Sequence, residues 1–427
     1  MLQSLLKNKF LSVSFFSAIS SLIRVATLLI IGKVIALLLG PEGLALVGQL
    51  SNFTVVVIVL AGNSISQGVT KYIAEHNVNQ SSVGRNEIIS TSFSIVALCS
   101  IICALFLIVL SPYLSKNIFL DQSYYSIFIY FGLSLFFTSL NNLLLAILNG
   151  HKKYKIFNFL NILSNIFNLI ISLLFIYFGK LYGALLSIVI NQSVAFLLNI
   201  YLLRNEHWLV RSNFKFFIKK SIAKQLFLFA TLSVFSTALY PLVTIITRNI
   251  IIDKVSLEGA GFYELVFRIS SSALMFFVLA ISTYYIPRIS EITRIEDIKK
   301  EVKDTYKVVI PLVFVLLAIV YFMRDFIIIL LASKEFLASS KLFLFQLIGD
   351  FFKINAQVIS FILVARAHIK LALLIEVSFN ILYIVFYYFF INYFGLIGAS
   401  YAYAFIYLLY LITFIIVYKH FILKRFK

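Results

Sequence analysis

The sequence has few charged residues, and the two signs are unequally represented. Only 12% of the 427 residues are Asp, Glu, Lys or Arg, whereas charged residues make up about 25% of an average soluble domain. Seventeen of them are acidic and 36 are basic. Hydrophobic residues, by contrast, reach 62% of the chain. This composition leaves no room for a soluble enzyme domain and indicates a chain surrounded mainly by lipid.

Several groups of functional residues are absent. The only two cysteines, Cys99 and Cys103, lie in one apolar stretch, which excludes a disulfide framework. All five histidines fall in expected loops or tails, so none is available inside a span as a metal ligand, acyl-transfer base or proton relay. No Gly-x-x-x-x-Gly-Lys-Ser/Thr run is present, so the chain encodes no P-loop ATPase. We therefore expect no cofactor and no enzymatic activity, and transport is favoured over catalysis.

Long apolar runs account for most of the chain. A bilayer core of about 30 Å requires roughly 20 apolar residues per helical span. We predict twelve spans, at residues 11–39, 43–72, 88–110, 124–148, 156–178, 181–203, 222–247, 259–287, 305–322, 340–365, 370–392 and 396–418. Glycine-containing turns separate several of them, at residues 40–43, 149–151, 179–183 and 395–398. The first run exceeds the core of a signal peptide and lacks an obvious cleavage site, so we expect an uncleaved first helix.

Basic residues are distributed unequally between alternate connections. Of the 36 Lys and Arg residues, 25 fall in the loops, tails and span ends of one side, seven in those of the other side, and four deeper within spans. Because cytoplasmic loops carry the excess of basic residues, both termini are expected to face the cytoplasm, in a bacterial inner membrane. Topology also explains the net charge of +19, so no nucleic-acid partner is expected.

Short glycine-containing segments occur twice, about half a chain apart. Leu257–Phe262 resembles Gly40–Leu44, and Phe394–Ala399 resembles Phe178–Ala184 with one insertion. Six spans per half is an even number, so the two halves have the same orientation. That arrangement is a parallel repeat about an axis along the membrane normal.

The repeat predicts the domain organisation. We expect a six-helix lobe at residues 1–203 and a second six-helix lobe at 222–427. Residues 204–221 are rich in basic and aromatic side chains. They are expected to form a cytoplasmic amphipathic linker helix on the anionic inner leaflet. The predicted fold class is an all-α membrane protein with two parallel-repeat lobes.

Charged residues inside a span need a specific reason, because burying a charge in lipid is costly. Arg24 lies near the middle of the first span, about 20 Å from either end at 1.5 Å per residue, and has no acidic neighbour within a turn. Lys33 is closer to the outer surface. The second span adds amide side chains, at Gln49, Asn52, Asn63 and Gln67. Each amide alone is consistent with interhelical hydrogen bonding. Together with Arg24 they predict a hydrated cavity of surplus positive charge, which favours an anionic substrate such as a pyrophosphate.

Acidic residues within spans occur mostly in pairs with basic ones. Glu264 and Arg268 have i,i+4 spacing, and Asp350 and Lys353 have i,i+3 spacing, so each pair shares a helix face. Glu376 stands alone in the eleventh span. Two interpretations stay open for these residues: ion pairs that hold packed helices together, or sites that couple transport to an ion.

Short motifs give nearly the whole chain a resemblance to a known family. They are Gly32-Lys33, Gly40-Pro41 with Gly43-Leu44, Leu60-Ala61-Gly62, Gly68-Val69-Thr70-Lys71-Tyr72, Arg324-Asp325-Phe326, Gln346-Leu347-Ile348-Gly349-Asp350 with Lys353, and Glu376-Val377-Ser378. On these residues the chain resembles the Wzx-type flippases of lipid-linked oligosaccharides. These belong to the multidrug/oligosaccharidyl-lipid/polysaccharide exporter superfamily. The nearest likeness is to the O-antigen and enterobacterial common antigen translocases.

The resemblance implies two lobes around a central cavity lined mainly by the first, second, seventh and eighth spans. It implies a substrate, an oligosaccharide on undecaprenyl pyrophosphate, that is moved from the cytoplasmic to the periplasmic leaflet by alternating access. The basic cavity positions of the family correspond best to Arg24, then to Lys71 and Arg268. Lys71 is equally consistent with a topological anchor. Other glycan-assembly membrane proteins, such as a polymerase or a chain-length regulator, are the expected partners besides membrane lipids.

Two other functions compete with the flippase hypothesis. A multidrug–cation antiporter of the same fold would need a net acidic cavity to hold organic cations, and the spans of this chain are net basic. A membrane-bound glycan polymerase or acyltransferase would belong to another class altogether. Within the family, the O-antigen repeat unit and the enterobacterial common antigen intermediate, lipid III, stay open as substrates.

Overall fold

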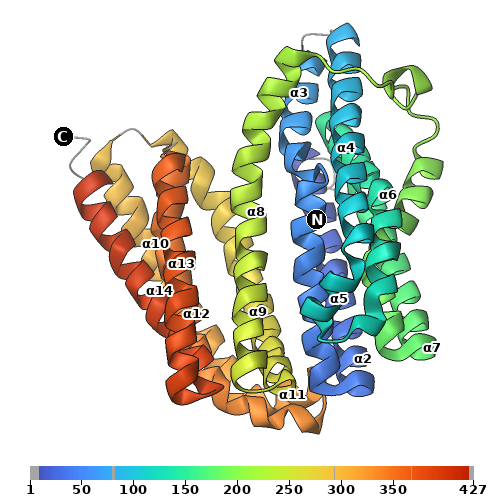
Figure 1. Ribbon diagram of the computed structural model, residues 1–427. Helices are drawn as coiled ribbons and strands as arrows, with labels where there is room; N and C mark the ends of the chain where they lie inside the picture. The colour runs from blue at the N-terminus through green and yellow to red at the C-terminus, as the bar shows by residue number, and fades with distance from the viewer. Residues whose placement is uncertain (1–8, 79–81, 293, 367, 423–427) are drawn as a thin grey trace. The chain divides into compact units, whose positions relative to one another are not determined.

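The computed structural model describes residues 9–78, 82–292, 294–366 and 368–422, which form helices and no strands (Figure 1). Its α-helices are α2 Lys9–Leu60, α3 Ser66–Val78, α4 Ser82–Val109, α5 Ser111–Phe119, α6 Tyr125–Gly150, α7 Tyr154–Leu202, α8 Lys220–Lys254, α9 Leu257–Glu291, α10 Ile295–Phe322, α11 Arg324–Leu331, α12 Phe343–Ala365, α13 Ile369–Phe394 and α14 Ile397–Val417. Helices are the expected solution here, because in lipid each backbone N–H and C=O group has to be satisfied within the chain.

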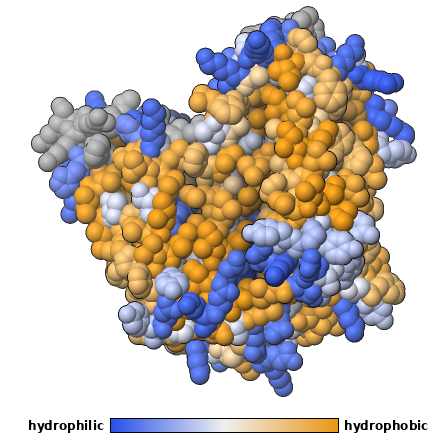
Figure 2. All heavy atoms as spheres, in the orientation of Figure 1, coloured by the Kyte–Doolittle hydropathy of each residue, from blue (hydrophilic) through white to orange (hydrophobic). Residues whose placement is uncertain are grey.

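The described part of the chain contains nine helices that are long and apolar enough to cross a bilayer. Two of these, Phe16–Leu60 and Tyr154–Leu202, have 45 and 49 residues. At 1.5 Å per residue, each is far longer than a bilayer core of about 30 Å. In Figure 2, hydrophobic residues cover most of the visible face and hydrophilic residues gather mainly toward the helix ends. An all-α, multi-pass membrane protein is therefore confirmed.

Helix α7 folds back on itself at the predicted turn. Lys180 has a φ of 47°, which interrupts the helix. The Asn191 side chain donates to the Asn168 side chain and to Ser172 Oγ (3.0 Å), which pins the second half of α7 against the first. A Cβ atom on Gly183 would lie 1.8 Å from the carbonyl oxygen of Phe175. Only glycine allows the two halves to approach this closely.

The turn between α13 and α14 uses the same arrangement. Gly395 has a φ of 60°, and a Cβ atom on Gly398 would lie 2.1 Å from the carbonyl oxygen of Phe390. In both turns a residue of positive φ comes three positions before the packed glycine, and the contacted carbonyl comes eight positions before it. The local repeat is therefore present, but Lys180 corresponds to Gly395 and the predicted insertion is wrong.

The predicted second span, 43–72, is not one continuous helix. Helix α2 ends at Leu60, a short 3-10 helix occupies Asn63–Ile65, and α3 begins at Ser66. Gly62 between them has a φ of 115°, and a Cβ atom there would lie 2.9 Å from Val96 Cγ2. The interruption arises because only glycine adopts this conformation this close to α4.

The described helices form two compact units. The first contains the described residues up to Leu39 together with Leu46–Leu242, and the second contains Gly40–Ala45 and Val243 onward. In the first unit α6 is central and packs against α3, α4, α5 and α7. In the second unit α12 is central and packs against α9, α10 and α14. The limits predicted for the two lobes, 1–203 and 222–427, stay a prediction.

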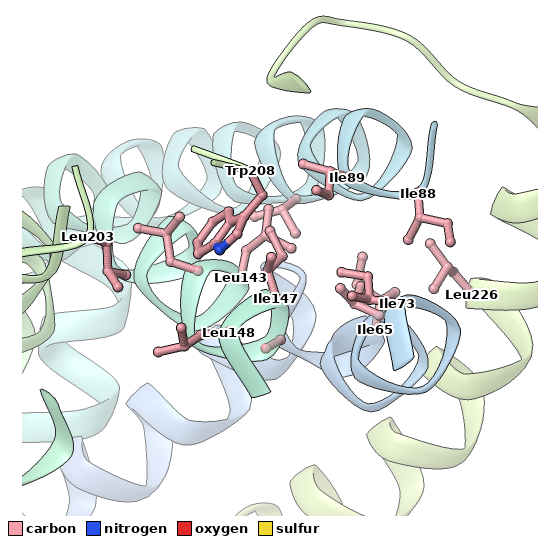
Figure 3. Close-up of a cluster of buried hydrophobic side chains, with 14 of the residues drawn as sticks. Ile65, Ile73, Ile88, Ile89, Leu143, Ile147, Leu148, Leu203, Trp208 and Leu226 are labelled. Carbon is pink, nitrogen blue, oxygen red and sulfur yellow. The ribbon is translucent and has the colours of Figure 1, made fainter. Parts of the chain in front are cut away.

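The basic segment after α7 is docked on the first unit and is not an amphipathic helix. Between Leu203 and Lys219 the only helical piece is the 3-10 turn Arg211–Asn213. Trp208 is buried in an apolar cluster with residues of α3, α4, α6 and α8 (Figure 3). Ser90 Oγ donates to the Asn213 carbonyl at 2.8 Å. The predicted helix is wrong. Hydrogen bonds from α4 side chains and the burial of Trp208 stabilise this segment in a non-helical conformation.

Candidate functional site

A depression of about 470 Å³ lies within the first unit, between α3, α6 and the start of α7. Its lining is mostly uncharged and polar, and consists of Asn63, Ser66, Gln67, Thr70, Lys71, Asn142, Leu145, Ala146, Asn149 and Phe157. Its volume is in the range of about 300–1,000 Å³ that is typical of small-molecule sites. Three of the residues predicted to bind substrate, Asn63, Gln67 and Lys71, are brought together here.

Close packing of α3 on α6 positions this lining. Thr70 Oγ1 donates to the Ala146 carbonyl at 3.0 Å, and Asn77 Nδ2 donates to the Gly150 carbonyl at 3.1 Å. A Cβ atom on Gly150 would lie 2.8 Å from Ile73, so glycine lets the two backbones meet. The relative position of the two lining helices is therefore set at both ends of their contact.

The residues of the Gly-Val-Thr-Lys-Tyr motif make packing contacts with several helices in this region. Gly68 faces α8, where a Cβ atom would lie 3.0 Å from Leu226. Val69 is fully buried in the apolar cluster. Lys71 Nζ lies 5.4 Å from the ring centroids of both Tyr72 and Phe229, and 3.7 Å from Glu75. The motif thus joins α3 to α6 and α8, and leaves one cation at the edge of the depression.

Three amide side chains of the depression have no hydrogen-bond partner in the described part of the chain: those of Gln67, Asn142 and Asn149. The sequence reasoning missed Asn142 altogether and treated Asn149 only as a turn residue. A signal was nevertheless present, because Asn in the apolar fourth span needs a partner. Asn63 differs, since its Oδ1 accepts from Ser66 Oγ at 2.9 Å.

Other residues predicted to bind substrate lie outside the depression. Arg24 is exposed on α2 and Lys33 is half-buried, and neither has a hydrogen bond or ion pair within the described ranges. Gln49 is fully buried, and Asn52 Nδ2 donates to the Gly48 carbonyl at 3.1 Å in its own helix. Asn52 therefore fits the interpretation as a helix-stabilising amide.

The second unit holds a buried cluster of charges on α8 and α9. Arg268 Nε donates to Glu264 Oε1 at 2.6 Å, which confirms the predicted i,i+4 pair. A guanidinium that was predicted to lie in an outer loop, Arg248, is only 4% exposed in α8 and bonds to the other oxygen of Glu264. One carboxylate is thus shared by two guanidinium groups, and the cluster keeps one net positive charge.

Asp350 lies at a second cavity, of about 300 Å³, between α9, α12 and α14. The carboxylate is fully buried and accepts from Ser270 Oγ at 2.6 Å and from Tyr403 OH at 2.9 Å. The neighbouring Gly349 leaves room for the Tyr403 ring, since a Cβ atom would lie 2.3 Å from it. Lys353 Nζ lies 5.1 Å from the Tyr407 ring centroid. The Gln-Leu-Ile-Gly-Asp motif therefore joins α12 to α9 and α14.

Glu376 on α13 is bound to the neighbouring helix. Tyr410 OH on α14 donates to Glu376 Oε2 at 2.8 Å, and Asn380 Nδ2 donates to the Glu376 carbonyl at 2.8 Å. Within the described ranges there is no group of three or more His, Cys, Asp or Glu residues that could hold a metal ion.

Long apolar helices that contain polar recesses and buried charges define a multi-pass membrane protein, and its fold is shared with solved transporters of the MOP superfamily. The structure matches the inward-facing conformation of a multidrug resistance MATE family transporter of that superfamily. The match has a TM-score of 0.78 and 15% identity, over 92% of this chain and 93% of that one. At this identity the match concerns the fold alone.

The chain belongs to the polysaccharide biosynthesis protein family, whose sequence model matches residues 8–293. It is also 30% identical over 401 residues to proteins named lipid III flippase in Escherichia coli K12 and Shigella flexneri, which covers 93% of this chain and 95% of each relative. The family resemblance drawn from the motifs is confirmed.

Proposed function

We propose that this chain is a flippase of lipid-linked oligosaccharides, and not an enzyme. The observation that carries the proposal is the 30% identity to lipid III flippases over 93% of the chain. Family membership over residues 8–293 supports it independently. The substrate is a glycan on undecaprenyl pyrophosphate, and it moves from the cytoplasmic to the periplasmic leaflet of the inner membrane.

Twelve spans fit this function. The interruptions at Gly40 in α2 and Lys180 in α7 divide each of these long helices into two spans, and α9, with 35 residues, supplies one more. Six spans in each half form two lobes of the same orientation. Both termini are cytoplasmic, and the lobes admit the substrate by alternating access.

The phosphate groups are assigned to the basic residues of α2, with Arg24 as the main ligand. Arg24 is exposed, lies about 24 Å from Gly40 at 1.5 Å per residue, and has no carboxylate partner in the described part of the chain. Its charge is therefore available to a ligand. Lys33 and Lys71 assist from the same chain half, whereas Arg268 already shares Glu264.

The names of the curated relatives favour lipid III of enterobacterial common antigen as the glycan lipid. An O-antigen repeat unit is the alternative, because it presents the same undecaprenyl pyrophosphate. A multidrug antiporter is the runner-up function, supported by the MATE fold match alone.

The test is the leaflet that the substrate occupies. In a deletion strain, the undecaprenyl-linked glycan should accumulate on the cytoplasmic leaflet, and the wild-type gene should move it to the periplasmic leaflet. Arg24→Ala should abolish this movement at normal expression, and Arg24→Lys should restore part of it. Full surface glycan with both variants would refute the phosphate role of Arg24, and accumulation on the periplasmic leaflet would indicate a polymerase instead.

A further inference from the structure

The depression between α3 and α6 combines features that phosphate binding does not explain. Gln67, Asn142 and Asn149 present amide groups without a partner in the described part of the chain. Gln67 is exposed, and Asn142 and Asn149 are half-buried, so all three amide groups are accessible to a ligand. Several accessible amides on one surface point to a ligand with many hydrogen-bonding groups.

The spacing of these residues places several amide groups along the depression. On α6, Asn142 and Asn149 are seven residues apart, about 10 Å at 1.5 Å per residue, on the same helix face. Asn63 in the 3-10 turn before α3, and Gln67 and Thr70 on α3, line the same depression. Each Asn or Gln offers two N–H donors and a carbonyl acceptor in one plane.

The charge of the depression is low. Lys71 is the only charged side chain in its lining, and Glu75 lies 3.7 Å from its Nζ atom. Phe157 adds an aromatic ring to the lining. One partly neutralised cation can assist phosphate binding but does not supply its main ligand, whereas amides around an aromatic ring suit the hydroxyl groups and apolar face of a pyranose.

We infer that this depression is the sugar subsite: Gln67, Asn142 and Asn149 bind the oligosaccharide and so determine which glycan is accepted. The inference rests on the proposed flippase function and separates two tasks within the first unit. The amides of α3 and α6 bind the glycan, while Arg24 binds the pyrophosphate. A polar phospholipid headgroup shares part of this chemistry, so the test has to distinguish the two ligands.

Binding to the purified full-length protein in detergent tests the division of tasks with two probes. One is the lipid-linked oligosaccharide extracted from the deletion strain, and the other is undecaprenyl pyrophosphate without sugar. The double variant Asn142→Leu/Asn149→Leu should bind the first probe about tenfold or more weakly, because the hydrogen bonds of two amides to the sugar are lost. Its affinity for the second probe should not change. Asn117→Leu, on an exposed part of α5, is the matched control and should bind both probes normally.

Each other result has a defined meaning. Equal losses for both probes, or no loss for either, would overturn the sugar subsite. If phosphatidylethanolamine or phosphatidylglycerol in mixed detergent micelles competes with the glycan probe, and the double variant abolishes this competition, the depression is a headgroup site and the sugar subsite is also overturned. Asn149→Gln retains the amide and should keep at least part of the affinity, which guards against a folding defect. If Arg24→Ala leaves the binding of both probes unchanged, the assignment of Arg24 to the phosphate is wrong. The sugar subsite is then decided separately, by the affinity of the double variant for the glycan probe.

Discussion

The amide groups in the depression of the first unit and the buried carboxylates of the second unit are used differently. In the second unit, Glu264 is bonded to two guanidinium groups, and Asp350 accepts from two hydroxyl groups. In the depression of the first unit, Gln67, Asn142 and Asn149 have no partner within the described residues. A polar group within a membrane protein therefore does not by itself mark a binding site. Polar groups whose bonds are already made stabilise helices, and groups that still lack partners can bind a ligand.

The largest expected effect is at the ion cluster of the second unit. Glu264→Gln removes the charge that compensates Arg248 and Arg268, and breaking a buried ion pair in this way costs about 3–5 kcal/mol. Thermal denaturation of the purified protein, followed by size-exclusion chromatography, should show a clear loss of folded material. Glu291→Gln, at a position 73% exposed, is the control and should behave as wild type. If Glu264→Gln denatures at the same temperature as wild type, the ion cluster does not stabilise the second unit, and the proposed difference between the two regions is wrong.

A smaller loss is expected at Asp350. Asp350→Asn leaves one of the two hydroxyl donors, Ser270 or Tyr403, without its acceptor, which costs about 1–3 kcal/mol for a buried group. The same denaturation assay measures it, with the exposed Asp325→Asn as control. If transport falls while stability is unchanged, Asp350 belongs to the coupling machinery and is not a structural acceptor.

At the depression the comparison predicts almost no change in stability. Gln67→Leu removes an amide that bonds to no described residue, so the free energy of unfolding should stay within about 0.5 kcal/mol of wild type. Translocation of the glycan lipid should nevertheless fall. A destabilisation comparable to that of Asp350→Asn would mean that the amide has a structural partner and would remove the difference between the two regions.

The smallest effect concerns pH at the surface of the first unit. The His151 ring stacks on the only tryptophan, Trp208, at 5.8 Å between centroids. Burial, followed by the nearby charges of Arg85 and Lys153, lowers the pKa of His151 below its usual 6.5. Because the folded protein resists protonation, stability is highest while the ring is neutral. It falls as the pH drops from about 6.5 toward the folded-state pKa.

Trp208 fluorescence should therefore be quenched with a midpoint below pH 6.5, and His151→Gln should remove the transition. A midpoint at or above 6.5 would show that the acidic neighbour Glu206, which raises the pKa, outweighs burial.

Local turns were predictable, because their chemistry lies in adjacent residues. The breaks at Gly40 and Gly395 and the end of α6 at Gly150 follow from glycine at the boundaries of apolar runs. The break at Gly62 was missed, because the glycine follows an uninterrupted apolar run and its necessity comes from Val96 of another helix. Helix α10 begins at Ile295, well before the predicted 305, because Glu296 and Asp297 favour a helix N-terminus.

The candidate sites were only partly predictable for the same reason. Glu264 and Arg268 were paired correctly, since their spacing places them on one helix face. Arg248 comes from a different helix, and no sequence periodicity connects it to Glu264. Likewise, Asn142 faces Gln67 only because α3 packs on α6. Contacts between helices depend on tertiary packing, which a hydropathy pattern does not specify.

The packed glycines of the two turns bear on how the protein can move. At Gly183 and Gly398, backbone meets backbone with no side chain between, so neither pair of helices can slide or splay without a void opening at the turn. The two helices of each pair are therefore expected to move together as a rigid body. Bending is therefore expected elsewhere, and Gly62, where the helical hydrogen bonds are already interrupted, is a suitable position for it, next to the depression that Asn63 lines.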